Sequence, residues 1–200
     1  MKSANKHLST TDPILAQLVK KYNLPPQKVL RRSRFEALVE SIISQQLSVK
    51  AADTIFFRFV GLFPGSKFPK PEVVAKLPTS KFRKVGISGQ KAGYIKDLAG
   101  QVASGKLKLG SLHRLENEKV IAELIKVKGI GRWTAEMFLM FTLRRPDVFS
   151  PGDLGLRNAI QKLYKLKGPP TERQLENITK KWSPYRTTAA RYLWRSLDNK

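Results

Sequence analysis

Asp153 is the carboxylate whose place in the sequence most favours a chemical role. It follows Pro151 and Gly152, and an amphipathic helical pattern begins directly behind it. An Asp at such a place caps the first N–H groups of the helix, and the positive end of the helix dipole keeps the carboxylate ionised. Two interpretations remain open: Asp153 is a cap alone, or it is a cap that also acts on a bound substrate.

A glycine turn at 128–131, with the sequence KGIG, lies between two helical patterns. Glycines one residue apart allow close backbone approach, and the amides that open the next helix form an anion site made of backbone. An ordinary tight turn is the alternative, but basic residues on both sides favour a phosphate that is held without reading of base sequence. The candidate ligands are Lys128, Gly129, Gly131, Arg132 and Thr134.

The charge balance supports a polyanionic partner. The chain has 38 Lys and Arg against 15 Asp and Glu, a formal net charge of +23. In a chain with 41% apolar residues this excess favours nucleic acid, with a membrane surface as the weaker alternative. The absence of cysteine excludes disulfides, thiolate metal sites and a cysteine nucleophile. Because no secretory signal or membrane span is visible, a soluble intracellular protein is expected.

Hydrophobic spacing predicts an all-α chain. Apolar residues between Phe35 and Ile43 follow the i, i+3, i+4, i+7 pattern of a helix facing a core, and similar stripes recur along the chain. No stretch alternates with the period of a strand. Residues 1–12 are polar and are expected to be a flexible tail, with Asp12 and Pro13 starting the first helix. The nearly all-apolar run 133–143 predicts a buried central helix.

Four motifs together resemble a known family. They are IISQQLS at 42–48, GISGQKAGYIKDLA at 86–99, VKGIGRWTAEMFLMF at 127–141 and PGD at 151–153. This combination resembles the helix-hairpin-helix Gly/Pro…Asp superfamily of DNA glycosylases, in its 3-methyladenine DNA glycosylase II branch and close to the short yeast type. The resemblance covers about 30–195. It implies one domain over 13–200 with two helical lobes flanking a DNA-binding cleft: lobe one about 45–130, lobe two about 13–44 plus 131–200.

The resemblance implies base-excision repair by a monofunctional DNA glycosylase. Asp153 would be the catalytic residue that stabilises the oxocarbenium-like sugar while the N-glycosidic bond of an alkylated purine is hydrolysed. Bases of the 3-methyladenine and 7-methylguanine type already carry positive charge, so they leave without an acid partner. Lyases of the superfamily place a lysine nucleophile where this chain has Trp133. Hydrolysis without strand cleavage is therefore expected, leaving an abasic site.

By the same resemblance, four residues line the pocket of the flipped base: Trp133, Met137, Leu154 and Tyr185. A cationic base favours aromatic walls. Met137 and Leu154 stand where the most aromatic relatives carry tyrosine, so a shallower pocket and weaker activity are expected. The other two tryptophans, Trp182 and Trp194, are expected in the core.

Gln46 corresponds to the family's wedge, the residue that fills the gap left in the duplex by a flipped base. Gln45 and Ser48 would be neighbouring DNA contacts; the alternative is that Gln45 and Gln46 only cap a helix end. The family also holds a monovalent cation, K⁺ or Na⁺, on backbone carbonyls of the hairpin, here those of Ile125, Val127 and Ile130. Beyond this ion no cofactor is expected.

The expected partner is double-stranded DNA, damaged or abasic, bound by a monomer regardless of base sequence and not at a membrane. The expected location is the nucleus in a eukaryotic cell, or the cytoplasm and nucleoid of a bacterium. Two rival functions remain open. One is a non-catalytic or weakly catalytic binder of damaged or abasic DNA with the same fold, and the other is a general helix-hairpin-helix DNA-binding module. Base release from methylated DNA separates the enzyme from both.

Overall fold

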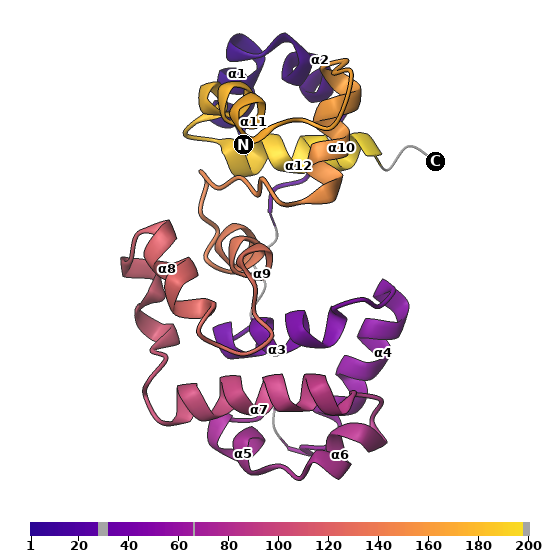
Figure 1. The fold of residues 1–200 in the computed structure, drawn as a ribbon, viewed down its shortest axis with the longest axis vertical. Helices are drawn as coiled ribbons and strands as arrows, with labels where there is room; N and C mark the ends of the chain where they lie inside the picture. The colour runs from indigo at the N-terminus through magenta and orange to yellow at the C-terminus, as the bar shows by residue number, and fades with distance from the viewer. Residues whose placement is uncertain (28–31, 66, 198–200) are drawn as a thin grey trace. The chain divides into compact units, whose positions relative to one another are not determined.

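A computed structural model describes residues 1–27, 32–65 and 67–197, and these residues form helices and loops without a strand (Figure 1). The all-α prediction is confirmed. None of the helices in these ranges has the length and apolar character needed to cross a membrane. The α-helices are α1 (Lys2–Thr11), α2 (Pro13–Lys21), α3 (Arg34–Ser44), α4 (Val49–Val60), α5 (Pro71–Lys76), α6 (Thr79–Lys84), α7 (Gly89–Ala103), α8 (Asn117–Leu124), α9 (Arg132–Met137), α10 (Leu154–Leu163), α11 (Glu172–Thr179) and α12 (Arg186–Leu197).

The chain divides into two compact units with bounds other than those expected. Unit 1 consists of Met1–Val29 and Leu139–Lys200, and unit 2 is Leu30–Phe138. Helix α3, expected in the lobe of the chain ends, therefore belongs to unit 2, as does α9 behind the hairpin. The apolar stripe of α3 packs against α4 and α7, which accounts for its place there.

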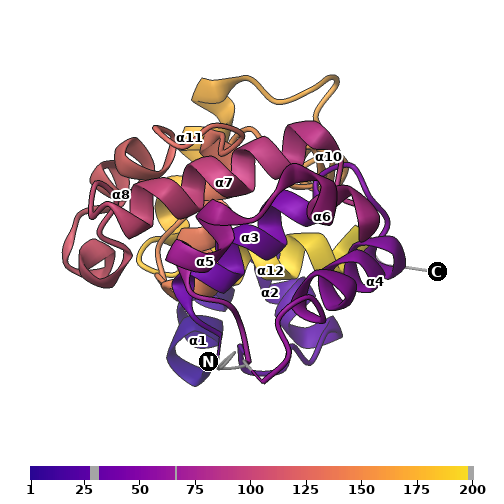
Figure 2. The same ribbon diagram turned by 90° about the horizontal axis from the view of Figure 1, so that it is seen from below.

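Unit 2 is built around α7, which packs against α3, α5 and α6 (Figure 2). The stripe predicted for α3 is confirmed, because Phe35, Leu38, Val39, Ile42 and Ile43 are all buried. Local sequence sets the helix starts: Ser33 and Glu36 form a capping box at α3, and Ser88 caps α7. A 3₁₀ turn at Leu109–Arg114 precedes α8.

Unit 1 brings together the two ends of the chain. Helix α12 packs against α10 and α2, and α1 packs against α2 and the 3₁₀ turn Lys180–Trp182 (Figure 1). The largest buried side chains here are Trp182 and Tyr192. The expectation of a core position is thus confirmed for Trp182. The core of unit 1 depends on residues from both termini.

The first residues form a helix rather than the expected flexible tail. Helix α1 spans Lys2–Thr11, and Leu8 is fully buried with Ala4 beside it. The sequence pattern is weak because only these two apolar side chains face the core of unit 1. Asp12 and Pro13 start α2 as predicted, since the Asp12 carboxylate accepts hydrogen bonds from the amides of Ile14 and Leu15.

Asp12 is a fully buried carboxylate that joins distant segments of unit 1. Its Oδ2 accepts hydrogen bonds from the Tyr164 hydroxyl and, at 2.8 Å, from the Trp182 indole N–H, and Lys181 Nζ lies 3.2 Å away. Burial alone would raise the pKa of Asp12, but these hydrogen bonds outweigh burial and hold the pKa below its ordinary value. Burial and the Asp12 charge raise the pKa of the Tyr164 hydroxyl.

The run 133–143 differs from the single buried helix that was expected. Helix α9 ends at Met137, and a π-helical turn follows at Phe138–Thr142. Ala135, Phe138, Leu139 and Met140 are buried, whereas Trp133 is 47% exposed. A nearly all-apolar sequence does not show which side of a helix is left uncovered, so the exposure of Trp133 is not visible in the pattern.

Candidate active site

Asp153 caps α10, as the sequence predicts. Its Oδ1 accepts a hydrogen bond of 2.8 Å from the Leu156 amide, and the residue is 8% exposed. A carboxylate at the start of a helix is held in one orientation and stabilised by the helix dipole. Asp153 is therefore a fixed, nearly buried acidic group.

Trp194, expected in the core, contacts Asp153 directly. Its indole N–H donates a 3.0 Å hydrogen bond to Asp153 Oδ1, the same oxygen that the Leu156 amide holds. The ring is half-buried and packs at 5.9 Å, centroid to centroid, against Phe141. This functional neighbour was missed because nothing in the local sequence links two residues that lie 41 positions apart.

Gly155 allows this approach. A Cβ atom built on Gly155 would lie 3.1 Å from Asp153 Oδ1 and 3.3 Å from Cδ1 of Trp194. Both separations are shorter than ordinary van der Waals contact, so any larger residue would press on the carboxylate and the indole. The glycine in the sequence Asp-Leu-Gly thus lets the carboxylate and the indole meet without displacement.

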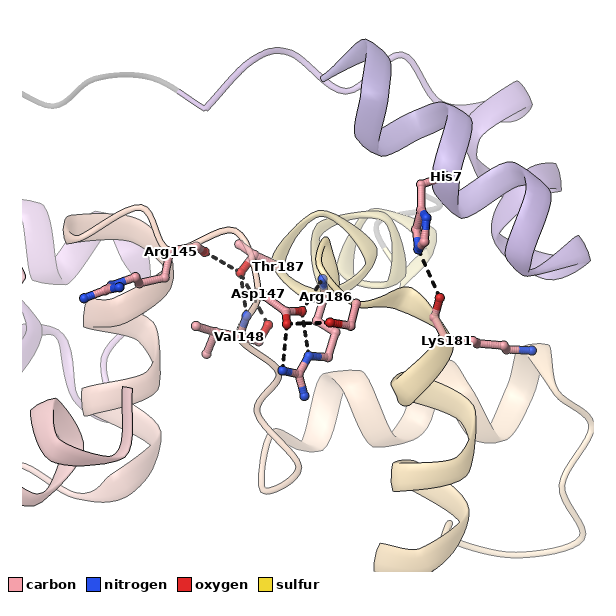
Figure 3. A network of polar contacts seen from close by, with 8 residues as sticks. His7, Arg145, Asp147, Val148, Lys181, Arg186 and Thr187 are labelled. Carbon is pink, nitrogen blue, oxygen red and sulfur yellow. Dashed lines mark hydrogen bonds and ion pairs between the residues drawn. The ribbon is translucent and has the colours of Figure 1, made fainter. Parts of the chain in front are cut away.

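The loop that leads to Asp153 is fastened to the start of α12 and to Ser183 just before it (Figure 3). Arg186 donates to Asp147 through Nε at 2.6 Å and Nη2 at 2.8 Å, and Ser183 Oγ donates to Asp147 Oδ2 at 2.8 Å. The Thr187 hydroxyl accepts from the Val148 amide at 3.1 Å. Burial would raise the pKa of Asp147, but the bonds from Arg186 and Ser183 hold that pKa below its usual value.

This fastening also fixes Tyr185, one of the predicted pocket residues. Tyr185 is half-buried, and its ring meets the His7 ring edge-on at a centroid distance of 5.4 Å. His7 Nε2 lies 3.1 Å from the Lys181 carbonyl oxygen (Figure 3). His7 was expected in a flexible tail; instead it supports Tyr185 from α1.

The other predicted pocket residues divide between the units. In unit 1, Leu154 is 70% exposed beside Asp153 at the start of α10. In unit 2, Trp133 is exposed and Met137 is half-buried, both on α9. Their exposure is compatible with ligand contact, and the shared pocket remains a prediction.

The glycine hairpin of unit 2 rests on α7. Gly129 has a φ of +81°, and a Cβ atom there would lie 2.1 Å from Cδ2 of Tyr94, so only glycine fits. The Lys128 amide donates to Asp97 Oδ2 at 2.9 Å. That amide is therefore engaged within the unit. Within the described residues, the amides of Gly129 and Gly131 donate to no backbone acceptor outside the helices.

Two of the predicted phosphate ligands are buried or paired within unit 2. Thr134 is 5% exposed, so little of it is accessible at the surface, and its contact with phosphate stays a prediction. Arg132 binds Glu118 through both terminal nitrogens, at 2.6 and 3.0 Å, and Glu136 through Nε at 3.0 Å. Its guanidinium ties the start of α9 to α8, a role that the sequence does not indicate.

The polar residues at 45–48 occupy the turn between α3 and α4. Gln45 Nε2 donates to the Gly129 carbonyl at 2.8 Å, which joins this turn to the hairpin. Gln46 is exposed and has a φ of +57°. Ser48 caps α4 and lines, with Lys50 and Arg58, an open hollow of about 430 Å³. Gln45 is also the C-cap residue of α3, so both the capping alternative and the DNA contact stay open.

The hairpin carbonyls offer oxygen ligands of the kind that hard cations prefer. The Val127 carbonyl already accepts the Ile130 amide at 3.1 Å, which leaves it one lone pair. No group of three or more acidic or histidine side chains with metal-binding geometry occurs in the described ranges. The backbone oxygens of Ile125, Val127 and Ile130 are chemically suited to K⁺ or Na⁺, and the ion remains a prediction.

Comparison with known families identifies the chain. The profile described as "HhH-GPD superfamily base excision DNA repair protein" matches residues 39–184, well over half of the sequence. The chain belongs to the HhH-GPD superfamily. This match includes the turn at 45–48, the hairpin and Asp153, and it confirms the resemblance drawn from the four motifs.

Curated and solved relatives agree with this assignment. The chain is 36% identical over 196 residues to DNA-3-methyladenine glycosylase 1 of Schizosaccharomyces pombe, covering 96% of this chain and 86% of that protein. It is 38% identical to a putative DNA-3-methyladenine glycosylase of Bacillus subtilis, covering 85% of this chain but 61% of that protein. The structure of S. pombe 3-methyladenine DNA glycosylase in complex with abasic DNA superposes with a TM-score of 0.85, 36% identity and coverage of 97% and 96%.

Proposed function

We propose that this protein is a monofunctional DNA glycosylase that removes alkylated purines of the 3-methyladenine and 7-methylguanine type and leaves an abasic site. The observation that carries the proposal is the Asp153 carboxylate, held by the Leu156 amide and the Trp194 indole within an HhH-GPD chain. The relatives named 3-methyladenine DNA glycosylases support this substrate class. The activity belongs to base-excision repair.

Asp153 acts on the sugar. As the bond between C1′ and the base nitrogen lengthens, positive charge develops on the sugar, and a fixed carboxylate stabilises that charge without reorganisation. The Leu156 amide and the Trp194 indole donate to Oδ1, so they orient the carboxylate before substrate arrives. Asp153 also orients the water that adds to C1′. An alkylated purine leaves as a neutral base, so no acid side chain is needed.

Strand cleavage is not expected. In the lyases of the superfamily a lysine at the start of the helix after the hairpin attacks C1′, and this chain has Trp133 there, in the first turn of α9. Without that amine no covalent imine with the sugar forms at this position. Borohydride added during the reaction should therefore trap no protein–DNA adduct, and a trapped adduct would refute the monofunctional assignment.

DNA is held through backbone and charge. Lys128 and the amides of Gly129 and Gly131 bind a phosphate, Gln46 enters the duplex, and Gln45 and Ser48 lie beside it. These contacts do not depend on the base sequence. The backbone carbonyls of Ile125, Val127 and Ile130 would hold a K⁺ or Na⁺ ion, whose positive charge would favour a phosphate at the hairpin. The net charge of +23 supports binding that weakens steeply with salt. We propose a monomer that acts wherever the cell keeps its DNA: the nucleus of a eukaryote or the nucleoid of a bacterium.

A weakly catalytic binder of damaged or abasic DNA is the second candidate. The observation that favours it is the chemistry of two pocket positions, where Met137 and Leu154 replace aromatic rings with flexible apolar side chains. A cationic base loses cation–π stabilisation of about 0.5–2 kcal/mol for each missing ring. The S. pombe protein described as alkylbase DNA glycosidase-like is 32% identical over 92% of its length.

One experiment separates the candidates. DNA methylated with a methylating agent is incubated with the wild type and with Asp153→Asn, and released bases are quantified by chromatography. The enzyme predicts release of methylated purines by the wild type and a loss of at least about a hundredfold in the variant. Equal, background release from both proteins, together with tight binding to an abasic duplex, would establish the binder instead.

A further inference from the structure

The turn between α3 and α4 holds Gln46 in an unfavourable conformation. Its φ of +57° is in the left-handed region, which costs a residue other than glycine roughly 1 kcal/mol or more. Gln46 is exposed, so burial of its own side chain does not compensate this cost. Groups around the turn must therefore hold the backbone there.

Lys91 supplies two of the contacts that hold the turn. Its Nζ donates to the Ile43 carbonyl at 2.8 Å and to the Gln45 carbonyl at 2.6 Å. The last carbonyls of a helix lack partners within the helix and form its negative end, where an ammonium is stabilising. Lys91 thus binds the end of α3 and the residue directly before Gln46.

The position of Lys91 in its own helix points to a role outside that helix. Lys91 lies in the first turn of α7, where a cation opposes the positive end of the helix dipole. It is half-buried, and burial lowers its pKa. Lys91 is therefore unfavourable for its own helix and partly desolvated. Its hydrogen bonds to the carbonyls of Ile43 and Gln45 account for its presence there.

The same side of α7 also carries the hairpin. Tyr94 packs under Gly129, and Asp97 accepts the Lys128 amide. The Gln45 side chain closes the connection by donating to the Gly129 carbonyl. Helix α7 therefore supports both the turn and the hairpin, and Lys91 is its residue that contacts the turn.

We propose that Lys91 is a positioning residue that keeps the turn in the conformation presenting Gln46 to the duplex. This inference rests on the proposed function, in which Gln46 fills the gap left by a flipped nucleotide. A turn ordered in advance loses less conformational freedom on binding, so the gap is filled more tightly. Lys91 acts through Gln46 and does not touch the DNA itself.

The test is a double-mutant cycle on binding, with the full-length chain. Affinity is measured by fluorescence anisotropy for a duplex with a tetrahydrofuran abasic analogue and for the same duplex intact. The proteins are the wild type, Lys91→Met, Gln46→Ala and the double variant. Lys84→Met, at an exposed lysine of α6 in the same unit, controls for the loss of one positive charge.

Lys91→Met should weaken binding to the abasic duplex by about tenfold relative to Lys84→Met and leave binding to the intact duplex at the control value. In the Gln46→Ala background, the same substitution should cost less than about twofold. Equal losses on both duplexes would mean that Lys91 contributes only charge. The inference would also be overturned if the losses of affinity from Lys91→Met and Gln46→Ala were additive in the double variant. The same holds if the wild type does not prefer the abasic duplex.

Lys91→Arg keeps a cation with several donors and should retain most of the preference for the abasic duplex. If Lys91→Met does not fold, judged by circular dichroism, this variant and Lys91→Gln decide the matter: Arg must preserve the preference and Gln must lose it. The cycle needs no catalysis. If the wild type releases no base but Lys91 and Gln46 are coupled in binding, the proposed enzyme activity is refuted and the inference about Lys91 stands. If the wild type releases base and the two residues are not coupled, only the inference is refuted.

Discussion

The indole N–H of Trp194 and the Asp153 carboxylate are joined by a hydrogen bond of 3.0 Å between the last helix of the chain and the start of α10. The Leu156 amide approaches the same oxygen at 2.8 Å. Two N–H donors converging on one carboxylate oxygen fix its orientation far better than a cap alone. Trp194 is therefore part of what orients the Asp153 carboxylate for its proposed catalytic role.

Replacing Trp194 with phenylalanine keeps a ring against Phe141 and removes the donor. We expect the single-turnover rate of base release to fall by about ten- to a hundredfold, because the carboxylate loses its fixed orientation. Affinity for abasic DNA should change by less than about threefold. A rate equal to that of the wild type, with an unchanged melting temperature, would show that the hydrogen bond has no catalytic consequence.

Gly155→Ala tests the same contact by steric pressure. The new Cβ would lie 3.1 Å from Asp153 Oδ1 and displace it or the indole by a few tenths of an ångström. We expect a loss of rate in the same direction as for Trp194→Phe. The matched control is Gly152→Ala, where a Cβ meets nothing within 4 Å. Equal rates for the two alanine variants would contradict the prediction.

Gly129→Ala should destabilise unit 2. A Cβ atom would overlap the Tyr94 ring at 2.1 Å, and alanine is strained at a φ of +81°. Together these effects should lower the free energy of unfolding by about 2–4 kcal/mol, measured by urea denaturation. Gly131→Ala provides the comparison, because its φ of −91° is ordinary and a Cβ there meets nothing within 4 Å.

Arg132 and Lys128 should respond differently to removal of their charge. Arg132→Met breaks the ion pairs with Glu118 and with the buried Glu136 and should cost about 1–3 kcal/mol of stability. The salt dependence of DNA binding should stay near that of the wild type. Lys128→Met should leave stability unchanged and reduce the slope of log K against log salt by about one. A reduced slope for Arg132→Met would make it a phosphate ligand after all.

Asp12 should make stability depend on acid pH. Because its pKa in the folded state lies below the ordinary value of 3.8, the stability that it provides is present above that value and is lost as pH falls through the folded pKa. Thermal unfolding of the wild type and Asp12→Asn between pH 2 and 7 measures the contribution of Asp12 to the free energy of unfolding. The variant should be less stable by about 2–4 kcal/mol at neutral pH, and the difference should shrink below pH 4. A constant difference across the range would contradict the assignment.

Local signals were sufficient where a few neighbouring residues decide the structure. The stripe from Phe35 to Ile43 predicts a buried helix face, and Asp12 and Asp153 predict helix starts, because capping depends on residues two or three positions away. The requirement for glycine in the hairpin also follows from the sequence. Its precise cause, the Tyr94 ring, does not.

The remaining features depend on contacts between distant residues. Trp194 looks like a core residue until its partner is known, and Thr134 looks accessible until its side of α9 is known. Lys91 is the instructive case, because a lysine in the first turn of a helix opposes the local rule and so hints at a partner elsewhere. The tail prediction failed because Ala4 and Leu8 alone give too weak an apolar signal for α1.

The discontinuous make-up of unit 1 has a consequence for how the chain folds during its synthesis. Asp12 meets Trp182 across 170 positions, so the first helices emerge from the ribosome long before their partners exist. Unit 2 is continuous and can complete its contacts earlier. Such late pairing is slow to form, since a long loop must close before the contacts stabilise it. The nascent α1 and α2 therefore stay without these partners until the C-terminal part of unit 1 has been synthesised.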